Sequence, residues 1–243
     1  FSEVNYASYA DPDLDIVLDD ARNYIATTNE SFSVIVTDVT NLKYKRNPYL
    51  YTREYFEIMR DALSPDGVAA AWLPVGGLSF NDLRTLIATF DDVFPNTSAW
   101  YFTQFPTHFI VLVGTPEPLQ VELAELAFRI PGVESDLRSL NVDNVYKLAS
   151  MLLLGEKDID ALVDGAPLHT DNRPILEYSD MDLYNVVDVA PNLGRLLEFQ
   201  TEDLLEYFAG DENELTRLEK HFDLYTGHYR NYIRVYERQR RGN

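Results

Sequence analysis

Two short apolar runs near the start of the chain constrain its fold more than any other feature. The first run, at residues 14–18, ends in Asp19 and Asp20. The second, at residues 32–36, is followed one residue later by Asp38. Apolar runs of this length that are rich in β-branched residues, with a polar segment of helical length between them, are typical of buried parallel strands joined by a crossover helix. The chain is therefore predicted to have an α/β fold.

The aspartates at the ends of these runs are candidate site residues. In an open α/β sheet, ligands bind outside the carboxyl ends of the strands, so Asp20 and Asp38 would face a common crevice. The competing interpretation is that each aspartate caps the helix or turn that follows it, which is a frequent role for this residue. Two neighbouring strands that end in the same way favour a binding site.

Three segments of this region, taken in order, resemble successive motifs of the spermidine synthase family. They are IVLDDARNY at 16–24, VIVTD at 34–38 and LYTREYF at 50–56. They are most similar to the large spermidine synthase-like proteins that often carry membrane-spanning segments ahead of the synthase domain. The resemblance implies the C-terminal part of a Rossmann-like sheet of the S-adenosylmethionine methyltransferase type, followed by an α-helical region. It also implies that the N-terminal half of the domain, with its Gly-rich turn, lies outside this chain.

The same resemblance assigns roles to residues of these motifs. Asp38 takes the place of the family's general base, and Asp20 with Ala21 falls where the family contacts the adenine amino group. Asp19 stands where a glycine is usual, and Asn41 stands where the acceptor loop normally has a second aspartate. The implied cofactor is decarboxylated S-adenosylmethionine or a related adenosyl nucleotide.

The chemistry of aminopropyl transfer explains why a carboxylate is needed. A primary amine attacks the methylene beside the sulfonium of the donor, and it must be neutral to do so, although free polyamines are mostly protonated at pH 7. A carboxylate at Asp38 would hold the cation and accept its proton. Asn41 cannot neutralise an ammonium group, and the lost charge-assisted contact amounts to roughly 1.5–3 kcal/mol. We therefore expect this chain alone not to turn over putrescine.

The rest of the sequence suggests three regions. Residues 1–117 are predicted to be a partial Rossmann-like synthase domain, 118–190 a helical cap and connecting segment, and 191–243 a C-terminal helical hairpin, compatible with one tetratricopeptide-type unit. Thr52 and Ser79 are the predicted N-caps of two helices. Strands are predicted at 68–73, 98–103 and 109–114, and helices at 22–29, 119–129, 142–154 and 158–163. The segment 167–178 resembles a recurrent segment of the same subgroup and is interpreted as structural.

Composition limits the partners. The net charge is −20, with 40 acidic against 20 basic residues, which argues against nucleic acid and anionic membrane surfaces and favours a polyamine or another cationic amine. Adaptation to a saline environment would produce the same acidity. No apolar run approaches the roughly 20 residues that span a bilayer, so we expect a soluble, cytoplasmic chain whose parent reaches a membrane only through other segments. A homo-oligomer or the other half of the domain would complete the site.

The remaining residue patterns say less about function. The sequence has no cysteine, no Gly-x-Ser-x-Gly elbow, and four scattered histidines, so neither a metal site nor hydrolase chemistry is predicted. Four arginines, at 234, 238, 240 and 241, fall in the last turns of a helix, where a solvated end that favours the macrodipole is expected rather than an anion site.

Three classes of function follow. The first is an aminopropyltransferase-like enzyme in the intact parent, inactive as this chain alone. The second is a non-catalytic scaffold or interaction module built on a synthase fold. The third is an S-adenosylmethionine-dependent methyltransferase on the same fold, since a fold alone does not fix the chemistry.

Overall fold

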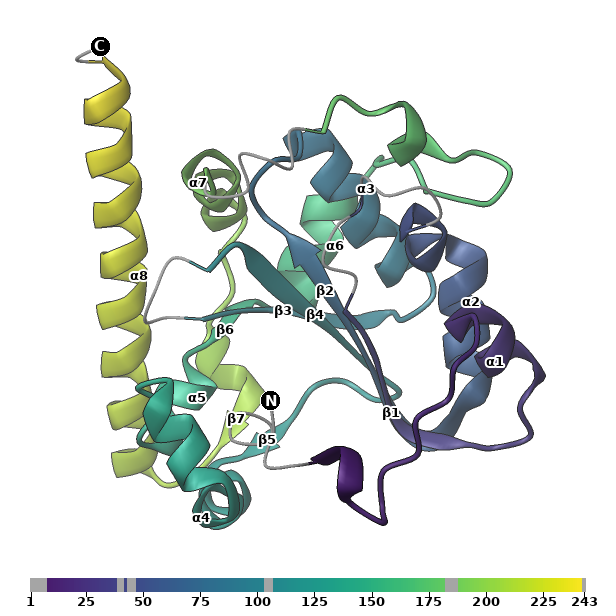
Figure 1. Ribbon diagram of the computed structural model, residues 1–243. Helices are drawn as coiled ribbons and strands as arrows, with labels where there is room; N and C mark the ends of the chain where they lie inside the picture. The colour runs from purple at the N-terminus through teal and green to yellow at the C-terminus, as the bar shows by residue number, and fades with distance from the viewer. Residues whose placement is uncertain (1–7, 39–41, 43–46, 103–106, 182–187, 242–243) are drawn as a thin grey trace.

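The structure, a computed structural model, describes residues 8–38, 42, 47–102, 107–181 and 188–241 (Figure 1). A five-stranded sheet has the order β1-β2-β4-β3-β6. Its strands are β1 (Phe32–Thr37), β2 (Leu63–Pro74), β3 (Asn96–Tyr101), β4 (Phe109–Thr115) and β6 (Leu152–Leu154). The pair β1 and β2 is parallel, and the other pairs are antiparallel. A second sheet pairs β5 (Val121–Glu122) with β7 (Phe208–Ala209).

Helices cover one face of the large sheet and make up most of the chain after β4. They are α1 (Ala21–Thr27), α2 (Arg53–Ala62), α3 (Phe80–Asp91), α4 (Leu123–Ser139), α5 (Val145–Ala149), α6 (Glu156–Val163), α7 (Ala190–Glu198) and α8 (Glu212–Arg241). Short 3-10 helices lie at Ser8–Ala10 (η1), Asn47–Tyr51 (η2), Ile175–Tyr178 (η3) and Leu204–Tyr207 (η4). The predicted α/β class, a mixed sheet followed by a helical region, is confirmed.

The main hydrophobic core lies between the sheet and helices α2, α3 and α6. Alternate residues of the central strands point into it, among them Ala71 of β2 and Leu112 of β4, which face each other across the ladder. Phe56 and Phe90 pack edge to face on the helical side, with ring centroids 5.1 Å apart. The opposite residues of the same strands are less covered, and Val34 and Val36 of β1 are more than half exposed.

The predicted strand at residues 14–18 is wrong. The segment is extended but belongs to neither sheet, and its apolar side chains face solvent, with Leu18 96% and Ile16 65% exposed. Among the described residues β1 is one of the two edge strands of the large sheet, and it pairs with β2. A strand is stabilised by a ladder and a covered face, and within the described residues segment 14–18 has neither.

Helix caps were predicted more successfully than strand ends. Thr52 and Ser79 cap α2 and α3, and their side chains accept hydrogen bonds from the backbone N–H groups of Tyr55 and Asp82. The strand predicted at 68–73 is longer than expected, because β2 already begins at Leu63. The extra residues are absorbed where the register against β1 shifts, as in a bulge.

The helix predicted at 142–154 is also wrong in its second half. It ends at Ala149, and Leu152–Leu154 form β6 against β3. The domain boundaries at 117/118 and 190/191 stay predictions. β6, from the second region, extends the sheet of the first, and the main core also takes side chains from the third.

The two C-terminal helices lie on the flank of the sheet. α8 runs along one side of the molecule, and its last turns extend beyond α7 (Figure 1). It contributes Tyr225 and Tyr229 to the main core and Leu218 to a second cluster built around Leu123 and Phe208. Among the described helices none combines the length and the apolar character that a bilayer crossing requires.

Candidate functional site

Asp20 lies at the amino end of α1 and acts as its N-cap. Its Oδ1 accepts a hydrogen bond of 3.1 Å from the backbone N–H of Asn23, and its own N–H donates to Asp19 Oδ1 at 2.7 Å. Asp19, Asp20 and Ala21 are all exposed. The capping role anticipated as the alternative is therefore real for Asp20. Within the described residues its second oxygen, Oδ2, accepts no hydrogen bond, so one oxygen stays accessible to a ligand.

Asp38 directly follows β1, and its side chain is exposed. The preceding residue, Thr37, is buried, and its hydroxyl shares a hydrogen bond of 3.0 Å with the phenol of Tyr55 from α2. This contact fixes the carboxyl end of β1 against the first turn of α2. Asn41, the predicted acceptor-side residue, lies outside the described residues.

Tyr55 connects the two predicted carboxylates. Burial raises the pKa of its phenol, while the Thr37 hydrogen bond and the positive charge of Arg22 lower it and the negative charge of Asp20 raises it. The phenol is thus hydrogen-bonded to the residue before Asp38, and Arg22, two residues after Asp20, donates to Thr52 at the N-cap of the same helix. Both aspartates therefore lie at the same end of the sheet, the end where β1 finishes.

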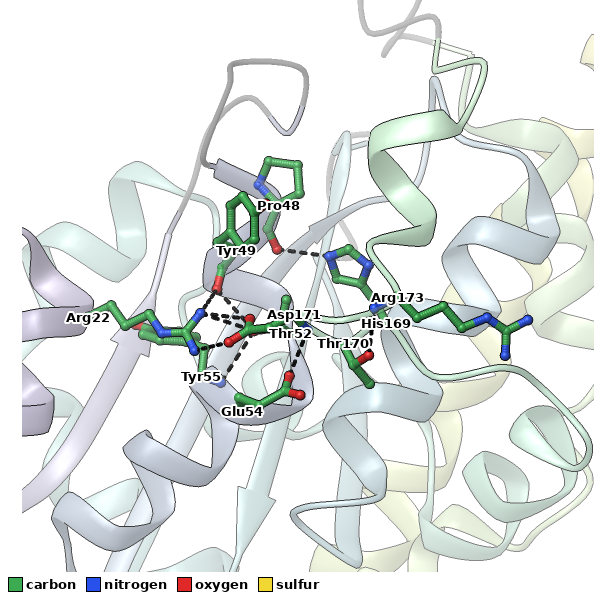
Figure 2. A network of polar contacts seen from close by, with 10 residues as sticks. All are labelled: Arg22, Pro48, Tyr49, Thr52, Glu54, Tyr55, His169, Thr170, Asp171 and Arg173. Atoms are coloured by element: carbon green, nitrogen blue, oxygen red, sulfur yellow. Dashed lines mark hydrogen bonds and ion pairs between the residues drawn. The ribbon is translucent and has the colours of Figure 1, made fainter.

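A polar network adjoins this end of the sheet (Figure 2). The guanidinium of Arg22 forms a two-pronged ion pair with Asp171, with Nη1–Oδ1 and Nη2–Oδ2 distances of 2.9 and 2.5 Å. Nη1 also donates to the carbonyl of Tyr49 at 3.2 Å and to Thr52 Oγ1 at 3.4 Å. The pair raises the pKa of Arg22 and lowers that of Asp171. Paired guanidinium and carboxylate groups with this geometry are among the stronger polar contacts.

The segment that carries Asp171 also binds the start of α2. The backbone N–H of Asp171 donates to Glu54 Oε2 at 2.9 Å, and the N–H of Arg53 donates to the carbonyl of His169 at 2.9 Å. Residues far apart in the sequence thus hold α1, η2 and α2 in one arrangement. The network fixes the position of α1, and with it the position of Asp20.

His169 anchors this segment from inside the protein. It is fully buried, and its Nε2 lies 3.0 Å from the carbonyl oxygen of Pro48. Because a carbonyl oxygen only accepts, Nε2 carries the proton, and the buried Nδ1 has no hydrogen-bond partner among the residues that the structure describes. Burial lowers the pKa of the imidazole. The ring is therefore a neutral structural group rather than an acid or base that reaches solvent.

The network was missed by reasoning from the sequence. Arg22 and Glu54 lie within the quoted motifs at 16–24 and 50–56, and Asp171 lies within the segment 167–178. The signal available was that all three segments belong to the same resemblance, which favours their meeting in space. Within the described residues, no group of three or more acidic or histidine side chains could hold a metal ion.

This arrangement can do two things chemically. Two exposed carboxylates at one end of the sheet, Asp20 and Asp38, can attract a cation and accept a proton from it. The buried contacts behind them, through Thr37, Tyr55 and Arg22, hold the elements that carry these carboxylates. The site is thus a pair of exposed carboxylates on elements that hydrogen bonds hold in place.

Comparison with known proteins agrees with the first three motifs. Residues 1–114 match the family described as spermine/spermidine synthase domain. The chain is similar to polyamine aminopropyltransferase 1 of Pseudomonas aeruginosa, at 28% identity over 97 residues, which cover 40% of this chain and 32% of that protein. It is also similar to the polyamine aminopropyltransferase of Shigella boydii, at 30% identity over 109 residues, 43% of this chain and 36% of that protein.

A solved structure of a probable spermidine synthase from Corynebacterium glutamicum is similar at 18% identity. The aligned part covers 65% of this chain and 54% of the solved chain, with a TM-score of 0.46. The chain spans about a third of the length of the curated relatives it matches, at 32% and 36%. The segment that matches the family, residues 1–114, contains both Asp20 and Asp38 and ends within β4.

Proposed function

We propose that this chain is part of a spermidine synthase-like aminopropyltransferase. In an intact synthase domain, it would take part in transfer of the aminopropyl group from decarboxylated S-adenosylmethionine to an amine. The observation that carries the proposal is the match of residues 1–114, with Asp20 and Asp38 at one end of the sheet. The chain alone is proposed to be inactive.

The roles proposed for the residues follow from their positions. Asp38, exposed directly after β1, accepts the proton of the attacking amine. Asp20 offers Oδ2 to the donor nucleotide, with Asp19 and Ala21 beside it, while Oδ1 caps α1. Asn41, which is outside the described residues, is proposed for the acceptor side from the resemblance alone. Arg22 is a positioning residue, because its ion pair with Asp171 holds the helix that carries Asp20.

The charge of the chain supports a cationic acceptor. At a net charge of −20, a diamine or polyamine is attracted toward the protein, whereas nucleic acid is repelled. The attacking amine must lose a proton, and a carboxylate beside it both lowers the energy of the bound cation and receives that proton. Asparagine at position 41 cannot neutralise an ammonium group, so it weakens the attraction of a cationic acceptor. This favours an acceptor other than putrescine.

Calorimetry with methylthioadenosine tests the nucleotide half of the proposal. The longest natural protein that contains this chain should release heat on binding, and Asp20→Asn should weaken binding. Asp38→Asn should leave nucleotide binding intact and abolish aminopropyl transfer. Asp66→Asn is the matched control, because Asp66 is exposed near the amino end of β2 and far along that strand from the site. No heat above background with the unaltered protein would overturn the proposal.

A second candidate is a non-catalytic module on a synthase fold. Two observations favour it: Asp20 already serves as a helix cap, and residues 14–18 are exposed instead of forming a strand. This candidate predicts a folded protein that binds neither methylthioadenosine nor S-adenosylmethionine. The methyltransferase alternative predicts binding of S-adenosylmethionine itself, so both nucleotides belong in the same titration.

A further inference from the structure

A groove runs between α7 and the C-terminal half of α8, away from the carboxylates of the proposed synthase site. Its volume is about 740 Å³. The floor is apolar and includes Leu197, Gly194 and Ile233. α7 and α8 are in direct contact here, since a Cβ at Gly194 would make an ordinary van der Waals contact of 3.6 Å with Cγ2 of Ile233. The groove is therefore built by helix packing and not by a loop.

The rim of the groove is strongly basic. It carries five arginines and two glutamates; the arginines are Arg195, Arg230, Arg234, Arg240 and Arg241. These are five of the 20 basic residues of a chain whose net charge is −20. None of the five forms an ion pair with the part of the chain that the structure describes. Arg195 and Arg240 lie over the rings of Phe80 and Tyr236, and Arg234 donates to Asn231 Oδ1, but none of these contacts neutralises a charge. Such a concentration of guanidinium groups without ion pairs among the described residues selects an anionic partner.

The spacing of the arginines shows the shape of that partner. Four of the arginines are on α8, at positions 230, 234, 240 and 241. Positions 230, 234 and 241 recur at helical spacing and lie along one side of the helix, with 240 next to them. At 1.5 Å per residue, this track is about 16 Å long. A single phosphate or a small anion would touch only part of it and would gain nothing from the apolar floor. An elongated ligand with an apolar stripe between acidic side chains fits both features.

The protruding end of α8 is consistent with a missing partner. Beyond Tyr229 no residue of α8 in the described range is fully buried, and Tyr232, Ile233 and Tyr236 are half-buried. In Figure 1 these turns extend past α7. Tyr232 and Ile233 pack against the main core, and the hydroxyl of Tyr236 donates to Asp188. The arginines on these turns are exposed, so a helix laid across this face would add packing to turns that are only partly covered.

We propose that this groove binds an acidic amphipathic helix of another protein. Its apolar residues would pack on Leu197 and Ile233, and its carboxylates would pair with the arginine rim, as in other helix-in-groove complexes. This differs from the solvated helix end expected from the sequence for the last arginines. The proposal does not depend on the synthase function.

Charge argues against two other occupants. A second copy related by a two-fold axis through the groove would bring its own arginine track against the first, and like charges would oppose the contact. Nucleic acid would also meet the field of a chain with a net charge of −20. An acidic helix satisfies the groove while remaining small enough to avoid the acidic remainder of the surface.

Fluorescence anisotropy with a defined peptide tests the proposal. The probe is a labelled 18-residue peptide of Glu, Leu and Ala, with leucines at helical i, i+3 and i+4 spacing and glutamates beside them. A second peptide of the same composition, with its leucines scattered around the helix, is the ligand control. We expect the amphipathic peptide to bind at least tenfold more tightly than the scattered one.

The matched protein variants are two double substitutions on α8. Arg230→Glu with Arg234→Glu alters the groove, whereas Arg217→Glu with Lys220→Glu makes the same charge change on the exposed amino half of the helix. The first variant should lose at least tenfold in affinity and the second less than twofold. Circular dichroism verifies that both stay helical, and Ile233→Ser, which changes no charge, should also weaken binding.

Four results would overturn the proposal. Equal losses in the two double variants would mean that the peptide responds to overall charge and not to the groove. Equal binding of the scattered peptide would reduce the site to an anion surface. Displacement of the peptide by inorganic triphosphate at the same concentration would identify a small-anion site, and peptide-free dimerisation that Arg230→Glu abolishes would identify a second copy as the occupant.

Discussion

Two apolar runs of similar composition have opposite fates in this structure. Residues 14–18 are exposed and lie outside both sheets, with Leu18 96% exposed. Leu152–Leu154 form β6, and all three side chains are at most 2% exposed. The shorter run becomes a strand because β3 offers it a partner, at Ala99 and Trp100. Apolar character makes a strand only where a ladder and a covering layer are both present.

The surroundings of β6 explain the difference. α6 begins directly after β6. Two carboxylates, one at the start of α6 and one after α7, each accept hydrogen bonds from backbone N–H groups beside the other. Asp158 Oδ1 accepts from the N–H and hydroxyl of Thr201 and from the N–H of Glu202, while Glu202 Oε2 accepts from the N–H of Lys157 and of Asp158. We call this exchange the α6 clasp. β1 is covered on one face only: Ile35 is buried in the main core, whereas Val34 and Val36 on the other face are exposed.

The largest contrast is expected between Leu154→Ala and Leu18→Ala. Leu154 is fully buried, so its truncation should lower the free energy of unfolding by about 2–5 kcal/mol. Leu18 is exposed, and its truncation should change that free energy by less than about 0.5 kcal/mol. Urea titrations of both variants measure the difference. Similar losses would show that residues 14–18 are buried in solution.

The next contrast compares two carboxylates that both accept backbone hydrogen bonds. Asp158 is buried, and Asp158→Ala would leave the donors of Thr201 and Glu202 without their acceptor, at a cost of about 2–4 kcal/mol. Asp20→Ala removes an exposed N-cap, which typically costs about 1 kcal/mol. Chemical denaturation of the two variants gives the order. A larger loss for Asp20→Ala would mean that the α6 clasp contributes little.

A pH dependence is expected from Asp91 at the end of α3, on the covered side of the sheet. Burial, and then the charge of Asp160, raise the pKa of Asp91 from 3.8 to about 7. The folded state therefore holds this proton more tightly than the unfolded state. Its contribution to stability is fully present below pH 3.8 and is lost as the pH rises through 7. Because the side chain is partly exposed, the loss is roughly 1–2 kcal/mol.

Asp91→Asn isolates this contribution. The variant should be more stable than the parent at pH 8, and the difference should shrink toward pH 5. Unfolding free energies measured at both pH values test this. A constant difference would assign the effect to packing instead of titration.

The smallest effect is expected on the exposed face of β1. Val34→Thr with Val36→Thr changes two exposed side chains of β1 and should alter the unfolding free energy by less than about 0.5 kcal/mol. Thr is chosen because it also favours strands. Thermal unfolding monitored by circular dichroism is sufficient. A loss above 1 kcal/mol would show that another layer covers this face in solution.

Local signals in the sequence predicted local structure well. The caps at Thr52 and Ser79 and the strand Phe32–Thr37 could be read from neighbouring residues, because a cap or an alternating pattern is decided within a few positions. Residues 14–18 and 152–154 were interpreted wrongly because strand pairing depends on distant residues. An apolar run by itself does not show whether its partner strand is present.

The sequence names the two carboxylates of the candidate site but not the contacts that support them. Asp38 follows the strand expected at residues 32–36, whereas the strand expected before Asp20 is absent from the structure. The pairing of Arg22 with Asp171 spans 149 positions of the chain, and no local pattern marks it. Their roles in binding and catalysis stay predictions until the nucleotide titrations are made.

The helix α8 has a consequence for how the molecule unfolds. Its 30 residues give Leu218 to one hydrophobic cluster and Tyr225 and Tyr229 to the other. A single rod that is shared by two cores couples their melting, so that heat should disrupt both in one cooperative step. Severing the rod between the two clusters would uncouple them and reveal two separate transitions.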